Sequence, residues 1–541
     1  MLRILLILSM MTTLLGCLSQ PAEEISSLAK IQEQSSLKEA IALGNAGEQQ
    51  ENNQRYEEAK RLTRQAIFKA QAAQEQPNLA LAWLIRWHWQ LGRILKAQNQ
   101  IEAAIEAYQQ ALQILVPENE KAFQWKTEGS KALYEELRQI FLQLADILLQ
   151  RATTQTTEYQ QADLSLARDT MEKLKIVGLD TYFGECFSKK VKKNIDQFKA
   201  PQTAVIYPIL LPERLELLVS FPVQNTVVIF REKVAVSEDT INAVIHNFRI
   251  QIKKGRNSPE NKDYLNEAQQ LYRWLIAPLL PRLRQHHINT LVFVPEYILN
   301  ALPIAALHDG NSFIIKEFAV AITPTLSLTE ATQEKKLAPS ETKVLLSAIT
   351  EAVQNYPELP YVQKEIQAVN KWYRPKMLLN KEFTSKNFAD RLEKSPYDFI
   401  HIISHAEFAE KVTDSFILTY DGELKLKDLQ ESIESNPHEQ SFELLTLSAC
   451  NTAKGDQGWT ALGLSGIALK AGARSALATL WKVDDRATFH LIDKFYRHLN
   501  LSKQPLSKVR ALQTTQQEFL ELKFFHHPFY WASLALIGNW L

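Results

Sequence analysis

Apolar positions follow two different periods along the chain. From about residue 25 to 185 they recur every three or four residues among many Ala, Gln, Glu, Leu and Lys residues, which is typical of amphipathic helices. From about residue 200 onward, short apolar runs alternate with helical segments. The spacing of three or four residues predicts a helical half, and the alternation of apolar runs with helical segments predicts an α/β half.

Small residues repeat at fixed spacing within the helical half. The clearest copy has the spacing of a tetratricopeptide helix pair and consists of Leu91, Gly92, Ala104, Tyr108 and Ala111. An earlier copy consists of Ala46, Gly47, Ala59 and Ala66, and a looser third copy lies at 144–171. Small side chains would let two helices approach closely, and Tyr108 would fill the groove between them. We therefore expect tetratricopeptide-like helix pairs over residues 35–190.

Stacked helix pairs form concave surfaces that bind peptides or other domains. The helical half is therefore expected to bind a partner protein. Three tryptophans, Trp83, Trp87 and Trp89, lie on one stretch of this half, and two interpretations of them remain open. Each tryptophan is better explained as filler of the helical interior than as a ligand-binding side chain, whereas the half as a whole favours partner binding.

The α/β half begins with a predicted hairpin at 204–208 and 215–219, followed by a strand at 226–230. The later strands are expected at 290–294, 343–348, 398–403, 443–447 and 475–480. The helices between them are expected at 265–276, 362–372, 387–394 and 462–471. Apolar strands that alternate with helices predict a mainly parallel sheet covered by helices on both faces.

Two reactive side chains follow strands of this predicted sheet. His405 comes just after the strand at 398–403, and Cys450 comes just after the strand at 443–447. Ligands gather at the carboxyl ends of parallel strands, so neighbouring strands would bring the imidazole and the thiol together. A thiol is mostly protonated at neutral pH, and an adjacent imidazole can take its proton during nucleophilic attack. The pair is therefore a candidate cysteine–histidine dyad.

Each of the two residues also has an ordinary structural explanation. A buried cysteine usually acts as a small apolar side chain, and a histidine after a strand is often only hydrogen-bonded in a loop. The pairing of both residues at equivalent strand ends, with a glycine-bearing loop after Cys450, makes catalysis about as well supported as these explanations, and both interpretations stay open at this point.

The composition of the chain argues against nucleic-acid, metal and cofactor binding. The 541 residues contain 61 Lys and Arg and 61 Asp and Glu, so the net charge is zero and no nucleic-acid partner is expected. Three scattered cysteines, Cys17, Cys186 and Cys450, are too few for a disulfide scaffold or a thiolate zinc site. No helical His-Glu-x-x-His motif occurs, so neither a metal nor another cofactor is expected.

The amino-terminal segment predicts export. Residues 1–16 carry one charge, Arg3, and an apolar stretch too short to span a bilayer, which suits a signal peptide. Residues 14–17, with the sequence LLGC, resemble the lipobox of bacterial lipoproteins, in which cleavage precedes a cysteine that is then lipidated. A plain secretory signal or an uncleaved anchor is the less favoured alternative. We expect Cys17 to anchor the protein to a membrane of the bacterial cell envelope, facing outside the cytoplasm.

From about residue 290 onward the chain resembles the CHAT family of bacterial caspase-like domains, which commonly follow tetratricopeptide repeats. The matching segments include LPIAALHDG at 302–310, LPYV at 359–362, HIISHAEF at 401–408, LSACNTA at 447–453, AGARS at 471–475, LWKVDD at 480–485, HPFYWA at 527–532 and IGNW at 537–540. The resemblance implies helical repeats followed by an α/β caspase-like domain. It also implies a non-catalytic part at 200–340 packed against a catalytic part at 341–541. The amino-terminal segment and the helical period add a signal peptide at 1–16, a tether at 17–34 and a helical domain at 35–190.

The resemblance implies a cysteine endopeptidase that cleaves a protein or peptide through the dyad His405 and Cys450. Backbone N–H groups of Ala406 and Cys450 would stabilise the oxyanion. Glycine commonly follows the family's histidine, and Ala406 would be strained if that position required a positive φ.

Three further residues are candidates for the substrate pocket. Asp484 or Glu407 could supply an acidic pocket for a basic residue before the cleaved bond, and Ser448 stands where some relatives have an acid. The alternative to a peptidase is a catalytically inactive scaffold in which the caspase-like half binds partners. Ala406 and the oxidising compartment, where Cys186 could pair with Cys450, favour that alternative slightly.

Overall fold

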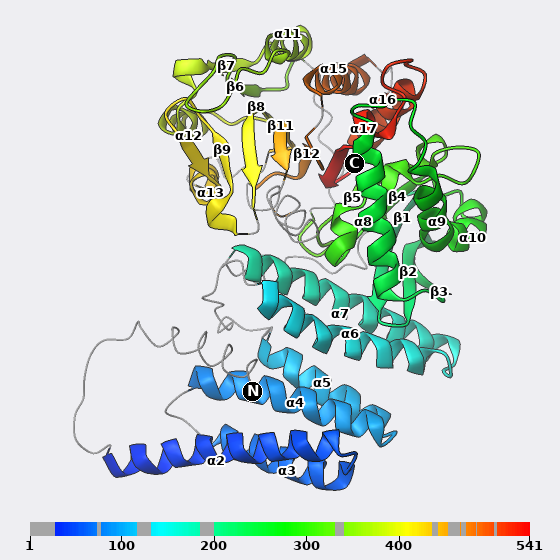
Figure 1. Cartoon of the computed structure of the whole chain (residues 1–541), viewed down its shortest axis with the longest axis vertical. Coiled ribbons are helices and arrows are strands. Elements are labelled where there is room, and N and C mark those ends of the chain that lie inside the picture. The colour runs from blue at the N-terminus through cyan, green and yellow to red at the C-terminus, as the bar shows by residue number, and fades with distance from the viewer. Residues whose placement is uncertain are drawn as a thin grey trace. The chain divides into compact units, whose positions relative to one another are not determined.

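The computed structural model of the chain divides into two compact units, Met1–Lys190 and Val191–Leu541 (Figure 1). It describes residues 27–72, 77–115, 131–183, 200–224, 226–329, 340–409, 411–434, 442–452, 466, 472–482, 484–501 and 506–541. Within these ranges, the side chains of residues 27–35, 77–78, 430, 433–434, 449–452 and 501 are not described. Cys17, Cys186 and the predicted helix at 462–471, apart from Gly466, lie outside the described residues.

The first unit consists of consecutive helix pairs. Its helices are α2 (Ser27–Asn52), α3 (Tyr56–Gln71), α4 (Pro77–Ala97), α5 (Ile101–Leu115), α6 (Lys131–Ala152) and α7 (Thr157–Phe183). Helix α2 packs on α3, α4 on α5 and α6 on α7, as the small-residue pattern predicts. That these pairs are tetratricopeptide repeats stays a prediction.

Glycines set the distance between the helices of this unit. A Cβ atom on Gly92 of α4 would lie 2.9 Å from the Tyr108 ring of α5, so the predicted contact between these positions is confirmed. A Cβ atom on Gly44 of α2 would lie only 2.0 Å from Trp87 Nε1. Trp87 and Trp83 are buried with their rings stacked 5.4 Å apart, which supports the interpretation of both as interior side chains.

The second unit is built on one mixed, mostly parallel sheet. Its strands are β1 (Thr203–Leu211), β2 (Arg214–Val223), β3 (Thr226–Val234), β4 (Thr290–Phe293), β5 (Ala319–Ile322), β6 (Val344–Ala348), β7 (Lys376–Leu379), β8 (Phe399–Phe408), β9 (Phe416–Leu418), β10 (Glu423–Lys425), β11 (Leu444–Thr452), β12 (Ser475–Thr479) and β13 (Leu534–Gly538). Among the described residues these strands pair in the order β10-β9-β8-β11-β12-β13-β5-β4-β1-β2-β3, with β6 between β7 and the first half of β8.

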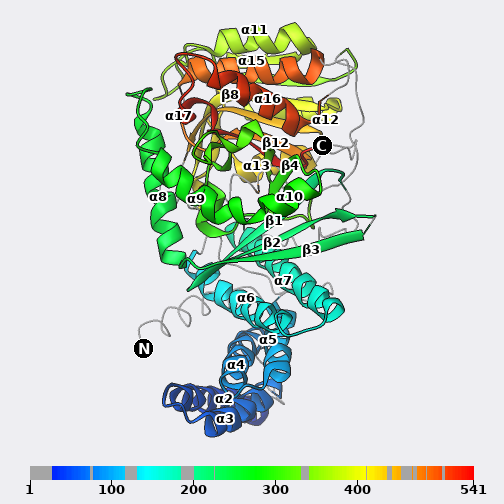
Figure 2. The same cartoon turned by 90° about the vertical axis from the view of Figure 1, so that its right-hand side faces the viewer.

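Helices cover this sheet. They are α8 (Glu238–Lys254), α9 (Leu265–Leu275), α10 (Leu280–Gln285), α11 (Val362–Tyr373), α12 (Ser385–Lys394), α13 (Leu426–Glu434), α15 (Asp485–Leu501), α16 (Lys508–Leu520) and α17 (Pro528–Trp531). Helix α15 packs beside α11 and α16, whereas α12 packs beside α13. Figures 1 and 2 show α11 and α15 on one side of β8 and α13 on the other. The predicted sheet with helices on both faces is thus confirmed.

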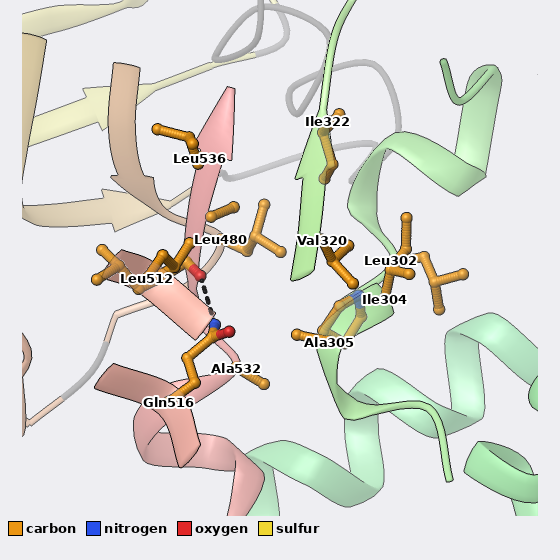
Figure 3. A pocket seen from close by; sticks show the side chains of 13 residues that line it. Leu302, Ile304, Ala305, Val320, Ile322, Leu480, Leu512, Gln516, Ala532 and Leu536 are labelled. Atoms are coloured by element: carbon orange, nitrogen blue, oxygen red, sulfur yellow. Dashed lines mark hydrogen bonds between the residues drawn. The ribbon is translucent and has the colours of Figure 1, made fainter. Parts of the chain in front are cut away.

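The carboxyl-terminal strand β13 joins the two parts of the sheet. It pairs antiparallel with β12 from Ser475↔Gly538 to Thr479↔Leu534, but it pairs parallel with β5 only at Ile537↔Ile322. An apolar pocket opens where β5 and β13 diverge, and Figure 3 shows its lining side chains, among them Val320 and Leu536.

Gln516 of α16 closes one side of this pocket, and its Nε2 donates to the backbone oxygens of Trp531 and Leu534. Because no lining residue comes from β8 or β11, the pocket belongs to the junction of the sheet and not to the candidate dyad.

No helix among the described residues is both long and apolar enough to cross a lipid bilayer.

The close approach at Gly44 gives a testable prediction for the helical unit. Gly44→Ala places a Cβ against Trp87, so we expect it to lower the free energy of unfolding by about 1–3 kcal/mol, as overpacking does. Asn45→Ala, at the exposed neighbouring position of α2, serves as the control and should be neutral or slightly stabilising because alanine favours helix. Urea denaturation followed by circular dichroism measures both, and equal stability of the two variants would contradict the packing argument.

Candidate active site

The two strands that carry the candidate dyad are neighbours. Strands β8 and β11 pair in parallel, with His401 opposite Thr446 and Ser448 opposite Ile403. Both strands run further than the sequence predicted, since β8 ends at Phe408 and β11 at Thr452. The expectation that His405 and Cys450 lie beyond their strands is therefore wrong, because each lies inside a strand near its carboxyl end.

The pairing of the two strands is irregular at the reactive positions. Ser448 pairs with Ile403, but the next pair in the ladder is Cys450 with Ala406. Two residues of β8, Ser404 and His405, therefore stand opposite the single residue Ala449 of β11. A bulge of this kind bends the strand and re-aims side chains.

The register brings the backbone of Cys450 next to that of His405. Paired strands lie about 4.8 Å apart, and the partner of Cys450 in the ladder is the residue that follows His405. The Cys450 side chain itself lies outside the described residues. Ala406, which pairs on its other side with Ile417 of β9, has extended strand backbone. Its Cβ therefore carries none of the strain that a positive φ would impose.

The imidazole of His405 is held by a backbone carbonyl. His405 is 7% exposed, and its Nε2 hydrogen-bonds to the oxygen of Pro357 at 2.9 Å. A carbonyl oxygen only accepts, so Nε2 carries a hydrogen and Nδ1 is the ring nitrogen left to take a proton. The Tyr356 ring packs against the imidazole, with the centroids 5.1 Å apart and the ring planes tilted by 38°. Neither Pro357 nor Tyr356 was predicted to belong to the site.

Acidic side chains lie near Tyr356 and near His405. Burial raises the pKa of the Tyr356 hydroxyl, and the nearby carboxylates of Glu407 and Glu423 raise it further. The ammonium group of Lys425, which pairs with Glu423, lowers it. Burial and the neighbouring Asp484 raise the pKa of Asp485 above its ordinary value of 3.8, while Lys482 and His405 lower it.

The three pocket candidates occupy different environments. Glu407 is half-buried on β8 close to His405 and Tyr356. Asp484 is exposed, and its Oδ1 accepts from the backbone N–H groups of Arg486 and Ala487, so it is the N-cap of α15. Ser448 is buried and donates to Glu365 Oε2 at 2.9 Å. Asp485 was not among the candidates, although its carboxyl interacts with His405.

Among the described residues, no three His, Cys, Asp or Glu side chains gather in an arrangement that could hold a metal ion.

Comparison with known proteins places the second unit in a family. A model of the CHAT domain matches residues 265–539, which is half of the chain. The chain belongs to the CHAT domain family. The match includes every strand from β4 to β13, and β1, β2 and β3 precede it. No curated protein sequence matches the chain.

Two solved structures resemble this CHAT protein. The Saccharomyces cerevisiae separase–securin complex has 11% sequence identity and a TM-score of 0.43, and the alignment covers 81% of this chain but 37% of that chain. The Arg specific cysteine proteinase gingipain R has 10% identity and a TM-score of 0.34, with 56% of this chain and 74% of that chain covered. The CHAT protein thus spans about a third of the length of the separase chain.

The capping geometry of α15 separates the roles of two adjacent aspartates. Asp484→Ala removes the acceptor for two backbone N–H groups, so we expect a loss of about 1 kcal/mol in the free energy of unfolding.

Asp485→Asn should instead stabilise the protein at pH 7, because a carboxyl whose pKa is raised on folding destabilises the native state once it ionises. That gain should shrink as the pH falls and disappear below 3.8, where the carboxyl is protonated in both states. Urea unfolding at pH 7 and pH 4 measures both variants. A loss of stability in Asp485→Asn as large as that in Asp484→Ala would contradict the assignment.

Proposed function

We propose that the protein is a cysteine endopeptidase of the caspase type, with His405 and Cys450 as the catalytic dyad. One observation carries this proposal, namely the register that sets Cys450 opposite Ala406 and so beside His405. Membership of the CHAT family supports it. The carbonyl of Pro357 supports it further, because this carbonyl leaves the Nδ1 atom of His405 free of a proton.

The reaction would follow from the acid–base state of these groups. His405 Nδ1 takes the proton of the Cys450 thiol, and the sulfur attacks the carbonyl carbon of the scissile bond. When the tetrahedral intermediate collapses, His405 returns the proton to the leaving amine and a thioester remains. Water, deprotonated by His405, then hydrolyses the thioester, releases the acid and restores the thiol.

The irregular ladder suits an oxyanion site. A bulge leaves backbone groups without regular ladder partners, and this bulge lies between Ser448 and Cys450. The N–H groups of Ala406 and Cys450 are the donors we propose for the oxyanion.

The charges around His405 favour a basic residue before the cleaved bond. Glu407 lies close enough to Tyr356 to raise the pKa of its hydroxyl, and Asp485 lies close enough to His405 for the imidazole to lower the pKa of the Asp485 carboxyl. Asp484 already accepts two backbone hydrogen bonds as the N-cap of α15, so it is a weaker candidate than Asp485 for binding the basic residue. The carboxylate of Asp485 receives no hydrogen bond from the described residues and is available to a substrate cation.

The remaining parts of the protein would deliver this activity to its target. We propose that the helix pairs of the first unit bind or regulate a partner protein, because stacked helix pairs provide extended surfaces. We further propose that Cys17 is lipidated and anchors the chain to a bacterial membrane, facing outside the cytoplasm. Several acyl chains on one residue would hold it firmly, since each buried methylene contributes about 0.8 kcal/mol.

The dyad is tested by labelling the purified protein with a peptide acyloxymethyl ketone and mapping the adduct by mass spectrometry. We expect an adduct only at Cys450, no adduct in Cys450→Ala, and loss of labelling in His405→Ala because the thiol then lacks its base. A probe with Arg before the reactive group should label faster than one with Asp. Cleavage of cell extract should be lost in the same two variants.

Cys186→Ala is the matched control, because it removes another cysteine and should keep both labelling and cleavage. Equal labelling of His405→Ala and the wild type would overturn the dyad and favour an inactive scaffold. Faster labelling by the Asp probe would overturn the basic preference and leave the dyad intact.

Lipidation is tested by metabolic labelling with a fatty acid in a bacterial host. We expect the wild type to take up label and to sediment with membranes, whereas Cys17→Ser should do neither because the acylated sulfur is missing. A Cys17→Ser protein that still takes up label would refute the anchor, and Cys186→Ser controls for acylation at another cysteine.

A further inference from the structure

A fully buried polar cluster lies beneath the candidate dyad. It consists of Glu365, His401, Thr446, Ser448 and Tyr496, none of which is more than 3% exposed. These residues come from two strands and two helices, namely β8, β11, α11 and α15. A buried polar group is costly unless it is hydrogen-bonded, so the partners of each member decide what the cluster does.

The carboxylate of Glu365 bridges the two reactive strands. Its Oε1 accepts from His401 Nε2 on β8 at 2.9 Å. Its Oε2 accepts from Ser448 Oγ on β11, also at 2.9 Å. Each oxygen therefore holds a different strand, and one side chain of α11 fixes the two strands relative to each other.

Tyr496 of α15 closes the cluster on its other side. The Tyr496 hydroxyl hydrogen-bonds with His401 Nδ1 at 2.8 Å and with Thr446 Oγ1 at 2.9 Å. Burial raises the pKa of Tyr496 well above its usual range, so the hydroxyl keeps its proton. The cluster thus ties both strands to both helices.

The bridged positions precede the reactive ones by two residues on β11 and by four residues on β8. Ser448 precedes Cys450 by two residues on β11. His401 precedes His405 on β8. Helix α11, which carries Glu365, begins at Val362, shortly after the Pro357 carbonyl that holds His405. One carboxylate therefore connects all three segments of the site.

We propose that Glu365 is a positioning residue, which sets the distance between the Cys450 thiol and the His405 imidazole by holding β11, β8 and α11 together. The inference rests on the proposed peptidase function. Glu365 touches no reacting atom in this assignment, and it acts through Ser448 and His401.

Three substitutions test the proposal through the peptidase kcat and KM and the rate at which iodoacetamide alkylates Cys450. Ser448→Ala removes only the hydrogen bond to β11, so we expect kcat and the alkylation rate to fall about 10- to 100-fold at nearly constant KM, as small misplacements of reacting groups do. Glu365→Ala should lower both at least as much. Glu365→Gln should stay within about threefold of the wild type, because its amide oxygen can accept from His401 while its NH₂ donates to Ser448.

Ser475→Ala is the matched control. Ser475 is also buried, at the start of β12, and its Oγ donates to the Asn539 oxygen, so its loss removes a comparable hydrogen bond away from the dyad. We expect it to cost similar stability in urea unfolding but to leave kcat and alkylation unchanged. Comparison of Ser448→Ala with Ser475→Ala tests the proposal even if Glu365→Ala fails to fold.

Each outcome decides the inference. A Ser448→Ala protein with wild-type kcat and alkylation rate, or one indistinguishable from Ser475→Ala, overturns it while the peptidase proposal stands. A Glu365→Gln protein as impaired as Glu365→Ala also overturns it, because charge and not position would then be the cause. A wild type without Cys450-dependent cleavage overturns the peptidase proposal and the inference together.

Discussion

The candidate site depends on one constraint, the pairing of β8 with β11. A change of one residue in a strand register turns every side chain to the opposite face, and a register is fixed where strands are buried on both sides. Both strands are buried along most of their length and each pairs with a second neighbour, β12 in one case and β6 followed by β9 in the other. The ladder therefore cannot slip without disrupting the whole central sheet, and Cys450 stays opposite Ala406.

The regular ladder alone would not serve a catalytic pair. In a regular parallel ladder the side chains follow a fixed alternation, whereas the bulge at Ser404 and His405 lets β8 present an extra residue to β11. The orientation of the imidazole then comes from outside the two strands, through the Pro357 carbonyl and the Tyr356 ring. The site thus combines a rigid sheet, which fixes the register of His405 and Cys450, with a loop that orients the imidazole.

Much of this organisation could be predicted from the sequence, and the failures have physical causes. The apolar runs predicted the starts of β1, β2, β3, β4, β6, β8, β11 and β12 to within one residue. By contrast, β5, β7, β9 and β10 contain three or four residues each and show no clear period. His405 and Cys450 stood out because imidazole and thiol are reactive. Pro357 acts through its backbone, which any residue possesses, so its side chain carried no signal. Asp484 and Asp485 are adjacent, and only the hydrogen bonds to Arg486 and Ala487 show which one caps α15.

Glu365 illustrates why the sequence could not reveal the support of the site. In the sequence it is one glutamate in the first turn of an amphipathic helix, where acidic residues are common because they favour the helix dipole. In the fold it is buried, and a buried carboxylate generally gives less stability than apolar side chains of the same volume would. Stability alone therefore does not account for a carboxylate at this place, whereas the need to hold two strands at one separation does. Its two oxygens, fixed in one plane, meet donors from both strands, and no single apolar side chain offers that directionality.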